Sequence, residues 1–185
     1  MKTVYSIAFF ILLLVYFSSC KKIKTTPLLT EPTQVGANTF SCLISGNPLI
    51  ARSSISQTSP SVLYQLHNGN AELQIYGGDY AKDPARNIGI FLRASEFKVG
   101  TYKLDSGQAL VQANVQGGHG GYIILGGGES MATGYDTGAA HQGTVTFSRV
   151  DIPSGIFSGT FEMEVSDTNG KVIQISQGRF DLKSK

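Results

Sequence analysis

The chain has 185 residues, with 15 Lys and Arg against 13 Asp and Glu and a formal net charge of +2. This near balance argues against a dedicated nucleic-acid binder, which carries a dense basic excess. The composition includes 22 Gly, 8 Tyr, 10 Phe and no Trp, which favours a glycine-rich β domain over a helical bundle. The length accommodates one domain.

Residues 1–19 predict a lipoprotein signal peptide. Lys2 gives a positive start, and residues 4–17 form an apolar run. As a helix this run would be about 21 Å long, too short for the roughly 30 Å hydrocarbon core of a bilayer. Phe17-Ser18-Ser19-Cys20 resembles a lipobox, where a signal peptidase cuts before a cysteine whose sulfur carries a diacylglyceryl group, although Leu, Val or Ile usually stands in place of Phe17. Cys20 is therefore predicted to be lipidated, with ordinary secretory cleavage as the alternative.

Residues 20–38 are predicted to be the lipidated cysteine followed by a flexible tether. The segment after Cys20 is rich in Thr and Pro and lacks apolar periodicity, which is typical of a tether. The predicted partner of this segment is the membrane, through the N-terminal lipid. Outer-surface lipoproteins of Bacteroidetes-like bacteria often carry acidic residues directly after the cysteine, whereas Lys21, Lys22 and Lys24 follow it here. We therefore expect a protein of the bacterial outer membrane that faces the periplasm.

Residues 39–185 predict a single all-β domain, either an antiparallel β-sandwich or a closed β-barrel of roughly ten strands. Short apolar segments alternate with turn residues, and none keeps a 3.6-residue period. Turns are expected at Asn47-Pro48, Asn68-Gly69-Asn70 and Asn169-Gly170. The candidate strands are residues 39–44, 48–52, 62–67, 71–76, 87–93, 100–104, 109–115, 121–125, 143–150, 155–165 and 171–182.

The candidate strand 155–165 has one apolar and one polar face. Phe161 lies on the apolar parity and Thr160 on the polar parity, so Phe161 is predicted to be buried and Thr160 exposed. In the last strand Ile173 and Phe180 have opposite parities, which predicts a β-bulge near residues 176–178. A strand covered on both faces is the alternative.

Cys42 is predicted to be a small buried hydrophobe, not a reactive thiol. It shares its parity with the apolar residues Phe40 and Ile44. Lipidation of Cys20 would leave it without an intramolecular disulfide partner.

Five short motifs occur in order at residues 39–47 (TFSCLISGN), 100–104 (GTYKL), 143–151 (GTVTFSRVD), 158–162 (SGTFE) and 178–181 (GRFD). Together they resemble the motifs of an uncharacterised lipoprotein family of Bacteroidetes, a domain of unknown function. The resemblance covers residues 39–182, but residues 106–142 match none of its motifs. It implies a signal-anchored β domain and brings no activity or catalytic residue with it.

No catalytic site, cofactor or metal is predicted. Asp136-Thr137-Gly138 is the triplet of retroviral aspartic proteases, but no second triplet follows and no apolar strand precedes it. His67, His119 and His141 lack the spacing of metal ligands. The glycine runs near residues 117–128 lack the Lys-Ser/Thr of a phosphate loop.

The sequence thus favours a non-catalytic binding or structural module of the cell envelope. The alternatives are a lipocalin-like carrier that holds a small apolar ligand in a closed barrel, and a hydrolase. If the protein binds a ligand, residues 116–142 are expected to contact it, because nine glycines there allow close backbone approach. Tyr122 and Tyr135 are the predicted ligand contacts. The competing interpretation is that residues 122–125 form another core strand between glycine-rich turns.

Overall fold

The computed structural model describes residues 29–81, 85–107, 118–126 and 132–184, and within these ranges the protein is all-β and antiparallel, as predicted. None of the described segments is an apolar helix of a length that could span a bilayer. The eleven strands are β1 (Thr39–Ile44), β2 (Asn47–Ile50), β3 (Ser61–His67), β4 (Asn70–Asp79), β5 (Arg86–Ala94), β6 (Gly100–Leu104), β7 (Gly120–Leu125), β8 (Thr133–Asp136), β9 (Gly143–Asp151), β10 (Ile156–Ser166) and β11 (Val172–Lys183).

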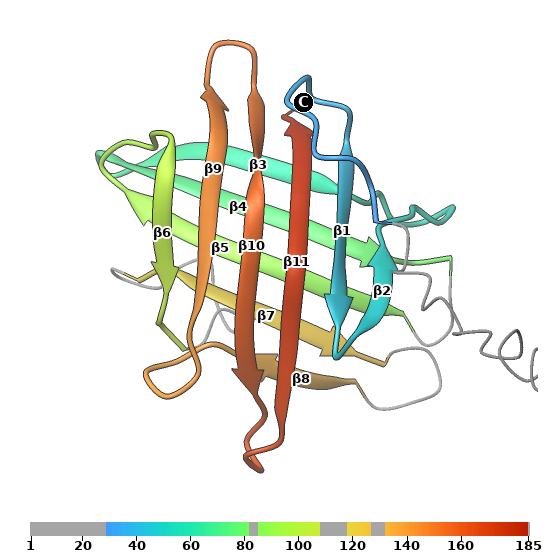
Figure 1. The fold of residues 1–185 in the computed structure, drawn as a ribbon. Coiled ribbons are helices and arrows are strands. Elements are labelled where there is room, and N and C mark those ends of the chain that lie inside the picture. Colours follow the sequence, from blue (N-terminus) through green and yellow to red (C-terminus); the bar gives the residue numbers. More distant parts are fainter. Residues whose placement is uncertain (1–28, 82–84, 108–117, 127–131, 185) are drawn as a thin grey trace, which may run out of the picture.

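The strands form one sheet that curls strongly into a half-barrel. The first arm of the sheet has the order β2-β1-β11-β10-β9-β6, and the second arm has the order β3-β4-β5-β7-β8. Figure 1 shows the strands of the first arm upright on the page and those of the second arm crossing behind them at a steep angle. The arms are joined where Ser166 of β10 pairs with Asp136 of β8. At another corner Arg52, just after β2, bridges to Asp79 at the end of β4.

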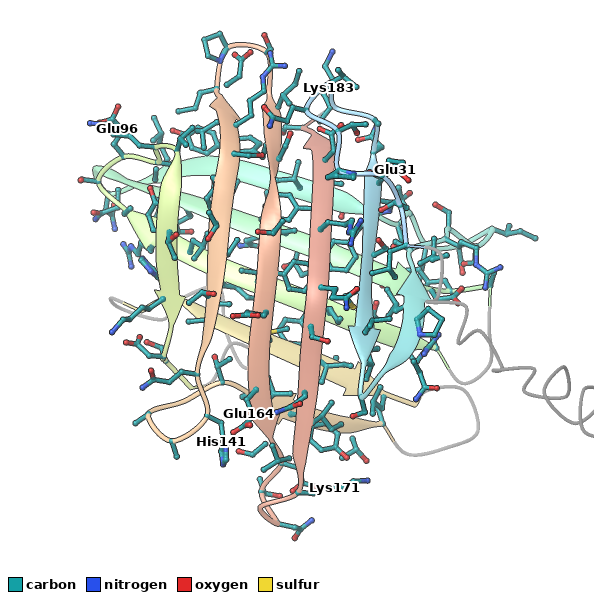
Figure 2. All side chains as sticks on the ribbon, viewed as in Figure 1. Glu31, Glu96, His141, Glu164, Lys171 and Lys183 are labelled. Carbon is teal, nitrogen blue, oxygen red and sulfur yellow. The ribbon has the colours of Figure 1, made fainter. Side chains whose placement is uncertain are left out.

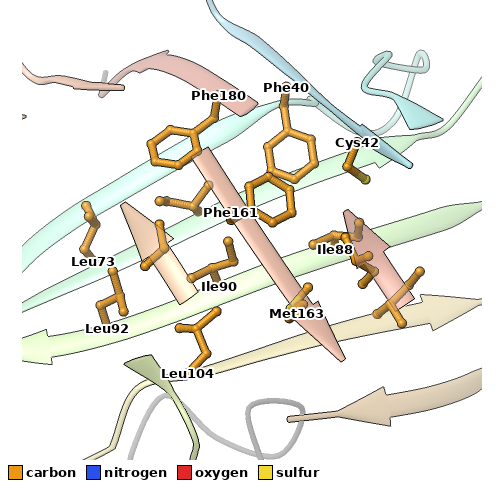
Figure 3. Close-up of a cluster of buried hydrophobic side chains, with 14 of the residues drawn as sticks. Phe40, Cys42, Leu73, Ile88, Ile90, Leu92, Leu104, Phe161, Met163 and Phe180 are labelled. Atoms are coloured by element: carbon orange, nitrogen blue, oxygen red, sulfur yellow. The ribbon is translucent and has the colours of Figure 1, made fainter. Parts of the chain in front are cut away.

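The inner faces of both arms meet in a core of aromatic and aliphatic side chains (Figure 3). Phe161 of β10 lies at its centre, with its ring centroid 5.0 Å from that of Phe40 and 6.4 Å from that of Phe180. Phe147 of β9 meets Phe180 edge to face at 5.6 Å. Offset and edge-to-face contacts are the arrangements that aromatic rings prefer, so these side chains fill the space between the arms.

Ten of the eleven candidate strands occur close to their predicted positions, and the other, at residues 109–115, lies outside the described residues. The sequence analysis missed β8. This strand has only four residues, and Tyr135 is its one large apolar side chain, so its local pattern is not that of a strand. Its place is set by pairing with β7.

The predicted register of the last two strands is confirmed. Phe161 is 3% exposed, whereas Thr160 lies on the solvent side. The bulge in β11 also lies where it was expected. Phe161 pairs with Gly178 and Met163 with Ile175, and Gln177 between these partners has a φ of 53°. The extra residue reverses the parity of the strand, so that both of its ends bury their apolar side chains.

The tight turns fit the positive φ angles that Asn and Gly tolerate. Asn68 and Gly69, with φ of 49° and 78°, join β3 to β4 as predicted. The first turn is placed differently. Ser45 and Gly46, with φ of 46° and 79°, form it, whereas Asn47 and Pro48 belong to β2. Pro48 is tolerated there because β2 lies at an edge of the sheet.

Residues 29–38, which were predicted as part of a flexible tether, lie against the first arm; we call them the strap. The carboxylate of Asp181 in β11 is 1% exposed and accepts hydrogen bonds from Thr33 Oγ1 at 2.6 Å and from the Gly36 amide at 2.8 Å. It also accepts hydrogen bonds from the amides of Val35 and Ala37, both at 3.0 Å. The described part of the predicted tether is therefore bound to the domain.

Burial by itself would raise the pKa of Asp181. The hydrogen bonds from Thr33, from the Ala37 and Gly36 amides and from Ser158 instead lower this pKa to about 2. Ser158 Oγ donates from β10 at 2.7 Å, so one carboxylate joins the strap, β10 and β11. Further along the strap, Arg179 donates to the Thr30 carbonyl at 3.1 Å. Figure 2 shows Glu31 on the strap beside β1 and Lys183 at the end of β11.

Candidate ligand-binding face

The outer face of the first arm is polar and shallowly hollowed. Two open hollows, of about 380 and 510 Å³, share Thr144 of β9 and Glu162 of β10. About half of the residues that line each hollow are threonine, glutamine or glutamate, and Pro32 of the strap borders the larger one. Alternation along the strands predicts such polar side chains for the solvated side of a sheet, so the polarity of this surface follows from the fold.

A hydrogen-bonded histidine–glutamate pair lies beside the smaller hollow. His141, in the loop before β9, approaches Glu164 of β10 with 2.6 Å between Nδ1 and Oε1. Figure 2 shows the two side chains together near the lower end of β10. The hydrogen bond from His141 lowers the pKa of Glu164. The pair joins the loop before β9 to the end of β10.

The outer face of the second arm departs from the polar pattern. Tyr76 of β4, Phe91 of β5 and Tyr122 of β7 project there, on the side opposite the core, and all three are half-buried. Leu63 of β3, 46% exposed, and Ile124 of β7 extend the same surface. We call these five residues the aromatic face. A contiguous apolar surface on the solvent side is the informative exception to the rule that apolar side chains are buried.

Strand pairing explains why the rings meet. Tyr76 pairs with Gly89, Gly89 pairs with Tyr122, and Tyr122 pairs with Asp136, so a single row crosses β4, β5, β7 and β8. Phe91 lies two residues from Gly89 on β5 and therefore on the same face. Diagonal neighbours on adjacent strands are within reach of aromatic side chains.

The stacked rings of Phe91 and Tyr122 form what we call the platform, and the ring of Tyr76 stands at one side of it. The ring of Phe91 lies 5.7 Å from that of Tyr122, with 23° between their planes, so the two rings are nearly parallel. Tyr76 stands at 85° to Phe91 with 5.6 Å between centroids. The Tyr76 hydroxyl donates to Gln74 Oε1 at 2.6 Å, and this hydrogen bond fixes its orientation.

Glycine at position 89 makes room for the platform. A Cβ built there would stand 2.2 Å from Cε1 and 2.5 Å from Cζ of Tyr122, so any side chain would displace this ring. Gly89 does not have the positive φ that would itself favour glycine. Glycine is therefore needed at position 89 because it has no side chain, which lets the Tyr122 ring lie against the backbone of β5.

The hydroxyls on this face are held in the neutral form. Burial, followed by the proximity of Tyr76, Tyr80 and Asp136, raises the pKa of Tyr122. Burial, followed by the proximity of Tyr80, raises the pKa of Tyr76. The phenols therefore stay protonated, able to donate and to accept hydrogen bonds.

The predicted ligand contacts do not share one surface. Tyr122 belongs to the aromatic face, whereas Tyr135 is 3% exposed and lies in the core. The register explains the difference, because Tyr135 pairs with the core residue Ile123 and not with Tyr122. Cys20 lies outside the described residues. Cys42 is fully buried, as predicted, and burial raises the pKa of its thiol to about 12.

In the structure, the Asp-Thr-Gly triplet and His119 make hydrogen-bonding contacts within the fold. Thr137 of the Asp-Thr-Gly triplet donates through Oγ1 to the Ser106 carbonyl and accepts from the Gly121 amide, both at 2.9 Å. Across the described ranges, no three His, Cys, Asp or Glu side chains gather as a group that could hold a metal ion. His119 lies 2.9 Å through Nε2 from the Arg93 carbonyl.

The sequence analysis did not single out Tyr76 and Phe91. The sequence does contain a signal that these two aromatic residues face outward. Each lies two residues after a non-apolar residue, and therefore on the same face of its strand: Gln74 precedes Tyr76, and Gly89 precedes Phe91. Comparison with known proteins adds nothing to the assignment, since no family model, curated protein or solved structure matches the chain. The functional argument accordingly depends on the geometry of the aromatic face.

Proposed function

We propose that the protein is a lipid-anchored, non-catalytic binding module of the cell envelope and that the aromatic face is its contact surface. The observation that carries this proposal is the group of Tyr76, Phe91 and Tyr122 on the outer side of the second arm. Tyrosine and phenylalanine supply large contact areas at a low cost in conformational entropy, and tyrosine adds a polar group.

The strap supports an anchored arrangement. Cleavage before Cys20 would leave residues 20–28 between the lipid and the strap. Nine extended residues reach at most about 32 Å, so the domain would stay close to its membrane. The resemblance to lipoproteins of Bacteroidetes and the lysines after Cys20 favour the outer membrane, with the domain facing the periplasm.

The filled interior favours a binding face over an internal carrier. Phe40, Phe161 and Phe180 occupy the space in which a lipocalin-like protein would hold its ligand. A hollow of about 250 Å³ beside Tyr64 and Phe157 lies between β3 and the β9–β10 hairpin. This hollow is open to solvent and is not a closed cavity between the two arms. We therefore favour a packed, sandwich-like interior over a closed barrel with a ligand cavity.

Metabolic labelling with a fatty-acid analogue tests the anchor. The wild-type chain should take up label and Cys20→Ala should not, while Cys42→Ala, the matched control, should label like the wild type. Proteinase added to intact cells should leave the protein uncut until the outer membrane is permeabilised. Equal labelling of the wild type and Cys20→Ala would contradict the anchor, and cleavage in intact cells would contradict the periplasmic orientation.

A further inference from the structure

We propose that the aromatic face binds a neutral polysaccharide, with sugar rings lying on Phe91 and Tyr122. This inference rests on the proposed binding function and names its ligand class. A pyranose ring has an apolar side formed by C–H bonds and hydroxyls around its edge. The negative face of an aromatic ring attracts such polarised C–H bonds, so a flat aromatic surface complements the sugar ring.

The arrangement of the rings fits a chain of sugars better than an isolated apolar group. Phe91 and Tyr122 form an offset stack of nearly parallel rings with 5.7 Å between their centroids, and successive sugar rings of a polymer can pack against the ring surface that this offset leaves uncovered. Tyr76, almost perpendicular to Phe91, bounds this surface on one side. Gly89 keeps the surface low by allowing the Tyr122 ring to approach the backbone.

Polar groups beside the platform match the edge of a sugar. The Tyr76 hydroxyl donates to Gln74 Oε1 and keeps oxygen lone pairs that can accept a hydrogen bond. The row that contains Tyr122 continues to Asp136 on β8, which places a carboxylate at the platform's edge. Sugar hydroxyls both donate and accept hydrogen bonds, so they can satisfy groups of either kind.

The charges on this side favour a neutral polymer. Among the outward residues of β3, β4, β5, β7 and β8, the charged ones are Glu72, Arg93 and Asp136. Glu72 and Arg93 already form an ion pair, with 3.6 Å between Oε1 and Nε. A face with two carboxylates and one guanidinium provides no positive field for phosphate, sulfate or uronate groups. Anionic polymers are thus disfavoured.

Affinity electrophoresis of the full chain in detergent tests the proposal. The gels contain hydroxyethylcellulose, xylan, laminarin or galactomannan as neutral probes, and alginate as the anionic probe. We expect retardation by at least one neutral polymer and none by alginate. Failure of all four neutral gels, or retardation by alginate alone, would overturn the ligand class. Neither result bears on the lipid anchor, which the labelling experiment tests separately.

Variants locate the site. Phe91→Ala and Tyr122→Ala should weaken retardation at least tenfold. Tyr122→Leu should do the same although it keeps an apolar side chain, whereas Tyr122→Phe should retain most of the binding. Tyr64→Ala is the matched control, because it removes a half-buried ring that stacks on Phe157 away from the face. Equal loss of binding in folded Tyr64→Ala would show that binding does not depend specifically on the aromatic face. Unchanged binding in Tyr122→Leu would show that the ring of Tyr122 is not needed. Either result contradicts the proposal.

Discussion

The ring of Tyr122 lies across the backbone of Gly89, so close that a Cβ on Gly89 would stand 2.2 Å from Tyr122 Cε1. This contact joins two strands on the solvent side of the sheet, where no core packing requires it. It also connects local geometry to function, because the orientation of this ring determines whether Phe91 and Tyr122 form one platform.

Gly89→Ala should therefore reduce ligand binding more than it reduces stability. The new methyl group forces the Tyr122 ring away from β5, and we expect at least a fivefold loss of retardation in the neutral polysaccharide gel. The free energy of unfolding should change by no more than about 1 kcal/mol, because alanine also lowers the entropy of the unfolded chain. Gly138→Ala is the control, since a Cβ there meets nothing within 4 Å. Unaltered binding in Gly89→Ala would contradict the platform.

Asp181→Asn should release the strap. The carboxamide cannot accept the same set of hydrogen bonds, so hydrogen exchange at residues 33–37 should accelerate while the core of β10 stays protected. Deletion of the Ser158 hydroxyl by Ser158→Ala should have a smaller effect, because it leaves the strap contacts in place. Exchange in the strap as slow as in the wild type would show that the carboxylate does not hold it.

The same carboxylate predicts a pH dependence. The pKa of Asp181 is about 2 in the folded chain against an ordinary value of 3.8. A lowered pKa stabilises the folded state above the ordinary value, and this contribution is lost as the pH falls from about 4 to about 2. The linked change in unfolding free energy is about 2 kcal/mol. Denaturant melts of Asp181→Asn should lack this part of the acid dependence, and an identical dependence in both proteins would refute the assignment.

Phe161→Ala and Thr160→Ala test the register of β10. Loss of the buried ring should lower the free energy of unfolding by about 3–5 kcal/mol, because the cavity lies between Phe40 and Phe180. Thr160→Ala changes the solvent side and should stay within about 1 kcal/mol. Similar losses for the two variants in denaturant melts would show that the faces are misassigned.

Thiol counting tests Cys42 and Cys20 together. In the native protein a thiol reagent should find no reactive group at neutral pH, because burial raises the pKa of Cys42 to about 12. In denaturant one thiol should react if the Cys20 sulfur carries lipid. Two reactive thiols in denaturant would exclude lipidation, and rapid reaction in the native state would contradict the burial of Cys42.

The elements that the sequence predicts well are those whose signal is local. Strands such as β10 show their buried face by alternation, and the opposite parities of Ile173 and Phe180 are enough to predict the bulge in β11. The strap lacks such a signal. It has no apolar period, and the groups that hold it include the buried carboxylate of Asp181 and the guanidinium of Arg179, both more than 140 residues further along the chain.

The candidate site depends on pairing between strands, which the sequence does not display. Tyr122 and Tyr135 both lie in the glycine-rich stretch, and only the register of β7 with β8 places one outside and the other in the core. In the same way, Tyr76 and Phe91 become neighbours because β4 pairs with β5. The sequence identifies the aromatic residues, and the fold decides which of them share a face.

The most direct test of the binding face uses the absence of tryptophan from the chain. Phe91→Trp puts a single tryptophan into the platform, and Val99→Trp puts one at an exposed site outside the aromatic face. Soluble oligosaccharides of the neutral polymer that retards the wild type are added to each variant while tryptophan emission is recorded. We predict a saturable blue shift in Phe91→Trp and none in Val99→Trp. An unchanged spectrum in Phe91→Trp, or the same shift in both variants, would contradict the aromatic face as the binding site.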